Sequence, residues 1–171
     1  ALEFGGTENP AGLWSYGWSP TLGGAFARAM ESRTIGGIEG WLGNQNGTIH
    51  PAVQYNRTAA TITADGTVWA PGALTLHPGA NNQYAVLRWT ASQAGIAMVS
   101  AVFRGVCTRG TTTDVHVLLN GQPLFETLFD GAVAPASAQD CRYSGLAVSD
   151  AQGRILLQGV KGANQAPGQS H

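Results

Sequence analysis

Charged residues are unusually few in this 171-residue sequence. Asp, Glu, Lys and Arg make up 11% of the residues, against roughly 25% in a typical soluble domain. Lys161 is the only lysine and the eight arginines are scattered, so the chain lacks the basic footprint that nucleic acid binding requires. The formal net charge of −1 gives little repulsion between copies, which favours self-association.

Long apolar runs, helical periodicity and catalytic motifs are also missing. No apolar run approaches the roughly 20 residues of a membrane-spanning helix, and no segment shows capped helical periodicity. The chain has no Gly-x-Ser-x-Gly, His-Glu-x-x-His, phosphate loop or dinucleotide-binding fingerprint. We therefore expect a protein that is not an enzyme. A hydrolase acting on polysaccharide is the catalytic alternative, because glycoside hydrolysis needs only two carboxylates across a cleft.

Cysteine is rare as well: Cys107 and Cys141 are the only two, 34 residues apart. They lack the Cys-x-x-Cys spacing of a zinc site, so the sequence predicts a disulfide and no metal site. Such a disulfide would contribute about 3.5–4 kcal/mol and implies an oxidising compartment. A start at Ala1 is typical of a mature secreted protein, so we expect secretion. No cofactor is expected; structural calcium stays open, because carbonyl ligands leave no sequence pattern.

The clearest positive feature is Asn120-Gly121, which separates the apolar stretches Val115–Leu119 and Leu124–Phe129. Asn-Gly between alternating apolar residues predicts a β-hairpin, because both residues tolerate the positive φ of a type I′ turn. Asp65-Gly66 predicts a second hairpin. Pro123 directly follows the first turn, which suits an edge strand or a strand start.

Gly and Pro interrupt the chain every eight to twelve residues, a spacing typical of a sandwich or barrel. The other predicted strands are Ala25–Ser32, Thr58–Thr63, Thr67–Trp69, Leu74–Leu76, Tyr84–Thr90, Ile96–Phe103 and Arg154–Val160. A short helix is the alternative for the first of these. We predict a single all-β domain over residues 1–171, a two-sheet antiparallel β-sandwich of jelly-roll type with one disulfide. Residues 1–7 and 161–171 are predicted to be extended terminal segments.

Aromatic residues provide the candidate glycan-binding site. Trp14, Tyr16 and Trp18 alternate and would share one face of an extended segment. Trp41 is predicted to lie in a Gly/Asn-rich loop, and loops carry function more often than strands do. Aromatic faces stack on sugar rings while polar groups bind the hydroxyls. The alternative is that the three alternating rings cap one end of the core.

Two pairs of polar residues are weaker candidates. Asp114 and His116 are next-but-one neighbours on the predicted hairpin and could hold a metal or orient a proton donor. A polar contact on a solvated sheet face is the commoner explanation for such a pair. Asn46 and Asn56 each begin an N-glycosylation sequon, although Asn-rich loops also produce this pattern by chance.

Five stretches carry a family resemblance: ENPAGLWSYGW (Glu8–Trp18), TLGGAF (Thr21–Phe26), ALTLHPG (Ala73–Gly79), YAVLRWTA (Tyr84–Ala91) and TTTDVHVLLNGQPLF (Thr111–Phe125). They resemble secreted bacterial β-sandwich modules of surface-sorted (PEP-CTERM-type) proteins, which are similar to carbohydrate-binding modules, and the resemblance extends over most of residues 8–130. The resemblance implies a secreted jelly-roll-like sandwich, with glycan binding as an analogy of fold.

The chain departs from this family near its C-terminus. Such modules continue beyond a strand like Arg154–Val160 into a closing strand, whereas this sequence reads GANQAPGQSH. The pair Cys107 and Cys141 is not part of the family pattern either. A missing closing strand would leave a sheet edge open, with unpaired backbone groups.

Two functional hypotheses follow. The first is a non-catalytic extracellular module that binds polysaccharide or another glycan, at the cell surface or in the matrix, through the candidate aromatic residues. The second is a structural subunit of an extracellular filament or surface layer. Its terminal segment, such as Ala1–Gly5, would add a strand to a further copy of the chain, and head-to-tail contacts of this kind produce fibres.

Overall fold

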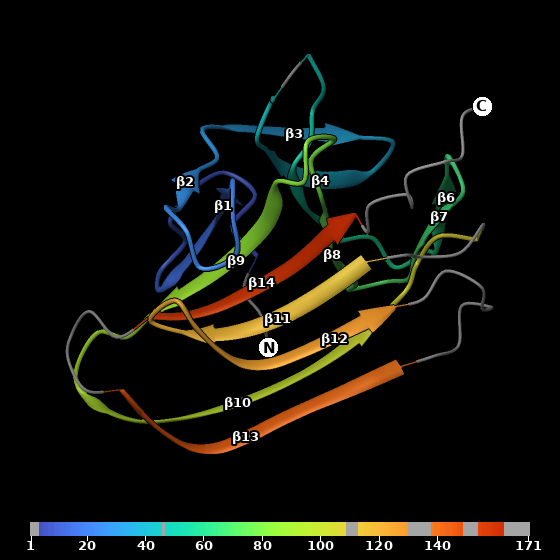
Figure 1. Ribbon diagram of the computed structural model, residues 1–171. Coiled ribbons are helices and arrows are strands. Elements are labelled where there is room, and N and C mark those ends of the chain that lie inside the picture. Colours follow the sequence, from blue (N-terminus) through green and yellow to red (C-terminus); the bar gives the residue numbers. More distant parts are fainter. Residues whose placement is uncertain (1–3, 46, 109–112, 130–137, 149–153, 163–171) are drawn as a thin grey trace.

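The computed structural model (Figure 1) describes residues 4–45, 47–108, 113–129, 138–148 and 154–162, with backbone alone for the last two ranges. These residues form antiparallel β-sheets and contain no helix, which confirms the all-β prediction. Accordingly, the described residues include no helix that is long and apolar enough to cross a membrane.

The described residues form fourteen strands, which are β1 (Trp14–Ser19), β2 (Ala27–Arg28), β3 (Glu31–Ile35), β4 (Ile38–Leu42), β5 (Ala52–Asn56), β6 (Ile62–Ala64), β7 (Thr67–Trp69), β8 (Leu74–His77), β9 (Tyr84–Thr90), β10 (Gly95–Arg104), β11 (Thr113–Leu119), β12 (Gln122–Phe129), β13 (Ala138–Val148) and β14 (Arg154–Gly162).

The central layer is a six-stranded sheet with the order β12-β11-β14-β9-β1-β2. Its register places Tyr16 opposite Leu87 and Leu87 opposite Leu157, which in turn lies opposite Val117. Tyr16, Leu87 and Val117 are fully buried. Because alternate residues of a strand point to opposite faces, this row marks the face of the sheet that packs against the second layer.

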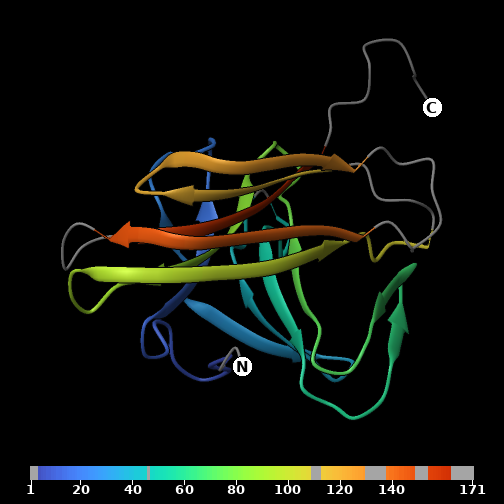
Figure 2. The same ribbon diagram turned by 90° about the horizontal axis from the view of Figure 1, so that it is seen from below.

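The second layer is made of two separate sheets. The four-stranded sheet β3-β4-β5-β8 covers the β1 end, where Tyr16, Trp41, Val53 and Leu87 share one buried cluster. The two-stranded sheet β10-β13 lies beside β11 and β12 (Figures 1 and 2). These contacts form a two-layer arrangement consistent with the predicted sandwich.

The opposite face of the six-stranded sheet is also covered. The segment between β1 and β2 lies over it, and Leu22 and Phe26 pack against a buried cluster that includes Leu118. The guanidinium of Arg88 also stacks on Phe26, with Cζ of Arg88 3.9 Å from the centroid of the Phe26 ring. Gly17 is required beneath Phe26, because a Cβ there would lie 2.8 Å from two atoms of the Phe26 ring.

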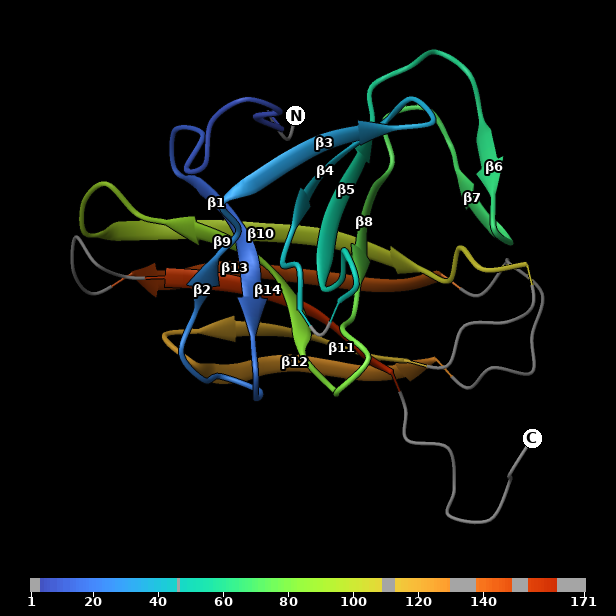
Figure 3. The same ribbon diagram turned by 90° about the horizontal axis from the view of Figure 1, so that it is seen from above.

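Both predicted turns are confirmed. Asn120 and Gly121 have φ angles of 52° and 83°, and Asp65 and Gly66 have φ angles of 48° and 77°. The β6–β7 hairpin projects from the two layers (Figure 3), and Thr67, directly after its turn, pairs with Cys107. Strand β9 has the predicted bounds, and β12 is an edge strand as Pro123 indicated.

Several details of the prediction are wrong. The single strand expected over Ala25–Ser32 is divided into β2 and β3, which belong to different sheets. The predicted Gly/Asn-rich loop around Trp41 contains a complete strand, β4. The two glycines before it form a turn with positive φ, and the strand then pairs on both sides. Tertiary pairing outweighs the poor β-propensity of its glycine.

The predicted disulfide is not seen in the described part of the chain. The backbone of Cys141 lies opposite Ala101 in the β10–β13 pair, whereas Cys107 pairs with Thr67. A disulfide requires Cα atoms closer than about 7 Å, whereas Cys141 pairs with β10 six residues before Cys107, which pairs with β7 instead. The side chain of Cys141 lies outside the described residues.

Asn56, at the end of β5, is fully buried and holds two neighbouring loops. Its side-chain nitrogen donates to the carbonyl oxygens of Ala60 and Trp69 at 2.8 and 2.9 Å. Its side-chain oxygen accepts from the backbone N–H of Thr58 at 3.0 Å. This burial favours a structural role for Asn56 over the candidate glycosylation, because a buried, hydrogen-bonded amide leaves no room for a glycan in the folded protein.

We predict that Asn56→Ala lowers the free energy of unfolding by about 2–3 kcal/mol, because it leaves buried backbone groups without partners. Urea denaturation followed by tryptophan fluorescence measures this loss. The matched control is Asn81→Ala at an exposed position, where we expect a change within about 0.5 kcal/mol. Equal effects of the two substitutions would contradict the assigned role of Asn56.

Candidate functional site

The structure divides the four candidate glycan-binding residues into two groups. Trp14 and Trp18 are half-buried at the two ends of the aromatic row on β1. Tyr16 is fully buried and Trp41 is 6% exposed. The rings of Tyr16 and Trp41 lie parallel, with centroids 6.3 Å apart. Neither ring has a face open to a sugar, so both residues belong to the core. For Tyr16 this agrees with the alternative interpretation, whereas Trp41 was expected in a loop.

A segment near the start of the chain covers this aromatic pair. We call residues Phe4–Gly6 the strap. Phe4 is 5% exposed, and its ring centroid lies 4.8 Å from that of Tyr16 and 5.3 Å from that of Tyr55. Phe4 therefore fills a pocket between β1 of the central layer and β5 of the second layer, where burial of one Phe side chain contributes roughly 1.5–3 kcal/mol.

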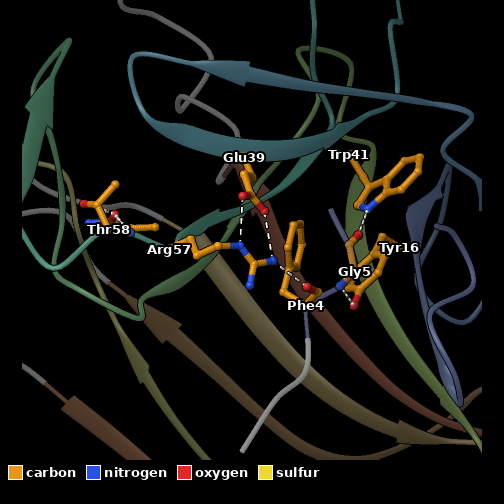
Figure 4. A network of polar contacts seen from close by, with 8 residues as sticks. Phe4, Gly5, Tyr16, Glu39, Trp41, Arg57 and Thr58 are labelled. Carbon is orange, nitrogen blue, oxygen red and sulfur yellow. Dashed lines mark hydrogen bonds and ion pairs between the residues drawn. The ribbon is translucent and has the colours of Figure 1, made fainter. Parts of the chain in front are cut away.

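Three side chains bind the backbone of the strap (Figure 4). The Gly5 N–H donates to the Tyr16 hydroxyl at 3.1 Å, and the Trp41 indole N–H donates to the Gly5 carbonyl at 2.6 Å. Arg57 donates to the Phe4 carbonyl at 2.8 Å. Buried phenol and indole groups need hydrogen-bond partners, and here the strap provides both.

Glu39 fixes the position of Arg57. Its two carboxylate oxygens accept from the Arg57 Nε and Nη2 at 2.9 and 3.0 Å. This two-point geometry orients the planar guanidinium, and the hydrogen bonds from Glu39 raise the pKa of Arg57 above its ordinary value. We call Tyr16, Glu39, Trp41, Tyr55 and Arg57 the strap site.

The strap sequence matches the space available. A Cβ on Gly5 would collide with the Cβ of Ala11, and a Cβ on Gly6 would lie 2.6 Å from a carboxylate oxygen of Glu39. The first obstacle is a methyl group bonded directly to the backbone and cannot rotate away, whereas the second is the end of a flexible side chain. The site therefore accepts an aromatic residue followed by glycine. Sequence reasoning missed it, because it treated residues 1–7 as an extended terminal segment that could add a strand to another copy, and not as part of the chain's own core.

Asp114 and His116 do form a contact, but away from solvent. His116 Nε2 lies 2.9 Å from Asp114 Oδ2, and the Tyr84 hydroxyl donates to the same oxygen at 3.4 Å. Burial, with the charge of Asp114 next, raises the pKa of Tyr84 to about 12. The other ring nitrogen of His116 is buried and 3.8 Å from Glu126. A proton donor would need that nitrogen open to substrate, so this geometry favours a structural contact.

His50 and His77 form an unexpected pair beside the second layer. Their rings stack with centroids 3.6 Å apart, and Nδ1 of His50 is buried with no hydrogen-bond partner among the described residues. Burial, and next the neighbouring His77, lowers the pKa of His50 to about 4. Within the described ranges, no group of three or more His, Cys, Asp or Glu residues could hold a metal ion. Asn46 lies outside those ranges.

Comparisons with protein families, curated proteins and solved structures find no match to this chain. The resemblance to secreted β-sandwich modules therefore stays a prediction drawn from the sequence motifs.

We predict an acid-sensitive contribution of His50 to stability. The unfolded state takes up a proton near pH 6.5, whereas folded His50 resists protonation until about pH 4. Unfolding is then favoured as the pH falls through this window, by about 1–2 kcal/mol once solvent screening is included. Urea denaturation at pH 7 and pH 4.5 measures the difference.

His50→Gln should remove this part of the pH dependence. The control, His77→Gln, should keep most of it, because burial is the larger cause of the low pKa. An unchanged pH dependence in His50→Gln would contradict the prediction.

Proposed function

We propose that this chain is a secreted, non-catalytic β-sandwich module that acts as a structural subunit of an extracellular filament or surface layer. The observation that carries this proposal is the β10–β13 pair. These strands of 10 and 11 residues pair only with each other among the strands that the structure describes. A two-stranded sheet is marginal alone, and strand addition from a second copy would extend it.

Strand β10 is a better acceptor for an added strand than the edge strands β3 and β12. Its sequence GIAMVSAVFR has no charge and no proline before Arg104, whereas the edge strands β3 and β12 carry charged residues or Pro123. Natural proteins protect sheet edges with charge and proline, so β10 is unprotected by comparison. Ile96, near its start, is 82% exposed. The low net charge supports the same proposal, because it provides little repulsion between copies.

The structure does not show the first residues of the chain as a free strand that could add to another copy. The described part of that segment, the strap, lies in its own fold and belongs to no strand. The proposal therefore places strand addition at β10.

A second candidate function is glycan binding by Trp14 and Trp18. Both rings are half-buried rather than buried, and four residues of a strand separate them by about 13 Å. This spacing would allow two contacts along one polysaccharide chain. Without Tyr16 and Trp41 the aromatic surface is smaller than the sequence indicated, which is why we place this function second.

We predict that the wild-type protein associates as its concentration rises and that Ile96→Lys weakens association at least about tenfold, because lysine blocks edge pairing. Analytical ultracentrifugation and electron microscopy provide the measurement. The matched control is Ile35→Lys on β3, another exposed isoleucine, which should associate like wild type. Monomers at every concentration would contradict the proposed assembly.

For the second candidate, we predict that Trp14→Ala and Trp18→Ala each reduce retention on a polysaccharide affinity gel by about tenfold, since a stacked aromatic platform is lost. Met30→Ala, at a 78% exposed position, is the control. Equal retention of all three variants would exclude the Trp14–Trp18 surface as the glycan site.

A further inference from the structure

The strap is held as a bound peptide would be held. Every residue of the strap site comes from β1, β4, β5 or the position directly after β5, and none is a sequence neighbour of the strap. The site combines one aromatic pocket with three hydrogen bonds to backbone atoms. A pocket for one side chain together with backbone hydrogen bonds is how proteins recognise short extended peptides.

The connection between the strap and the rest of the chain is short and exposed. Thr7 and Glu8 are both exposed, whereas Asn9 is fixed on β1. Its side chain donates to the Tyr16 carbonyl at 2.7 Å and to the Ala29 carbonyl at 2.8 Å, and accepts from the Tyr16 N–H at 3.0 Å. The strap can therefore leave its site by rotation at Thr7 and Glu8, while the anchor at Asn9 stays in place.

We propose that the strap is exchanged between copies of the chain, so that Phe4–Gly6 of one copy occupies the strap site of another. An exchanged strap makes the same contacts as before, so the exchange costs little, and a short hinge favours it. This inference rests on the proposed self-assembly but uses a surface separate from β10. Each can therefore fail without the other.

The strap site also defines which segment it accepts. Phe4 supplies the ring that stacks on Tyr55, and Arg57 donates a hydrogen bond to the Phe4 carbonyl. Gly5 lacks the Cβ that would collide with Ala11. The first residues of a second copy satisfy all of these requirements. A segment with alanine in place of Phe4 keeps the backbone hydrogen bonds but loses the buried ring.

The experiment mixes a variant whose strap cannot fill a strap site with a variant whose strap site cannot hold a strap. Phe4→Ala removes the donated ring and leaves its strap site intact, whereas Tyr55→Ala damages the strap site and keeps the strap. We expect each variant alone to show no strap-dependent association, and an equimolar mixture to form a one-to-one complex in analytical ultracentrifugation. The control mixture combines Phe4→Ala with the double variant Met30→Ala/Tyr55→Ala. Met30 is exposed and lies outside the strap site, so this mixture should form the same complex.

A labelled peptide, ALEFGGTE, provides a second readout by fluorescence anisotropy. It should bind Phe4→Ala at least about tenfold more tightly than ALEAGGTE does, since the phenylalanine ring carries most of the apolar burial. Wild type should bind it more weakly, because its own strap competes. If Phe4→Ala fails to fold, Phe4→Leu takes its place.

No complex in the mixture and no preference for ALEFGGTE, with both variants folded by circular dichroism, would overturn the exchange. If Phe4→Ala assembles as the wild type does, strap exchange is not an assembly contact. This result would overturn the exchange and leave the proposed function standing. Wild-type association that persists in Ile96→Lys but is lost in Phe4→Ala would support the exchange and overturn strand addition at β10.

Discussion

Burial of Tyr16 is the constraint on which the first half of the fold depends. Its ring lies between Phe4 and Trp41, and its backbone N–H and carbonyl both bind the side chain of Asn9. A phenol hydroxyl cannot enter a core without a partner at low cost, and the Gly5 N–H supplies that partner. Tyr16 and Trp41, which the sequence placed in a candidate sugar-binding surface, thus hold the strap instead.

The same packing places the two surfaces proposed for self-assembly in different parts of the molecule. The strap site is formed where the four-stranded sheet meets β1, whereas the two-stranded β10–β13 sheet packs beside β11 and β12 (Figure 2). The central six-stranded sheet connects them, and its other face is closed by Leu22 and Phe26. Because the chain has few charged residues, the proposed recognition between copies would depend on shape, apolar contacts and backbone hydrogen bonds rather than on ion pairs.

Sequence reasoning succeeded where one or two residues control the backbone. Asn120-Gly121 and Asp65-Gly66 produce the expected hairpins, because their positive φ values are accessible to very few residue types. It failed for Trp41, since a strand between glycines has the composition of a loop until its neighbours pair with it. It also missed Phe4 and Arg57, because residues 53 positions apart share no local pattern that would predict their contact.

The sequence by itself determined the all-β class, the positions of the two hairpin turns and the bounds of β9, because turn chemistry and alternation act over a few residues. The tertiary structure decided which aromatic rings are buried. A strand has two faces, and the sequence shows that Trp14, Tyr16 and Trp18 share one without showing what covers it. Only the packing of β4, β5 and the strap over that face decides that Tyr16 lies in the core while Trp14 and Trp18 stay partly open.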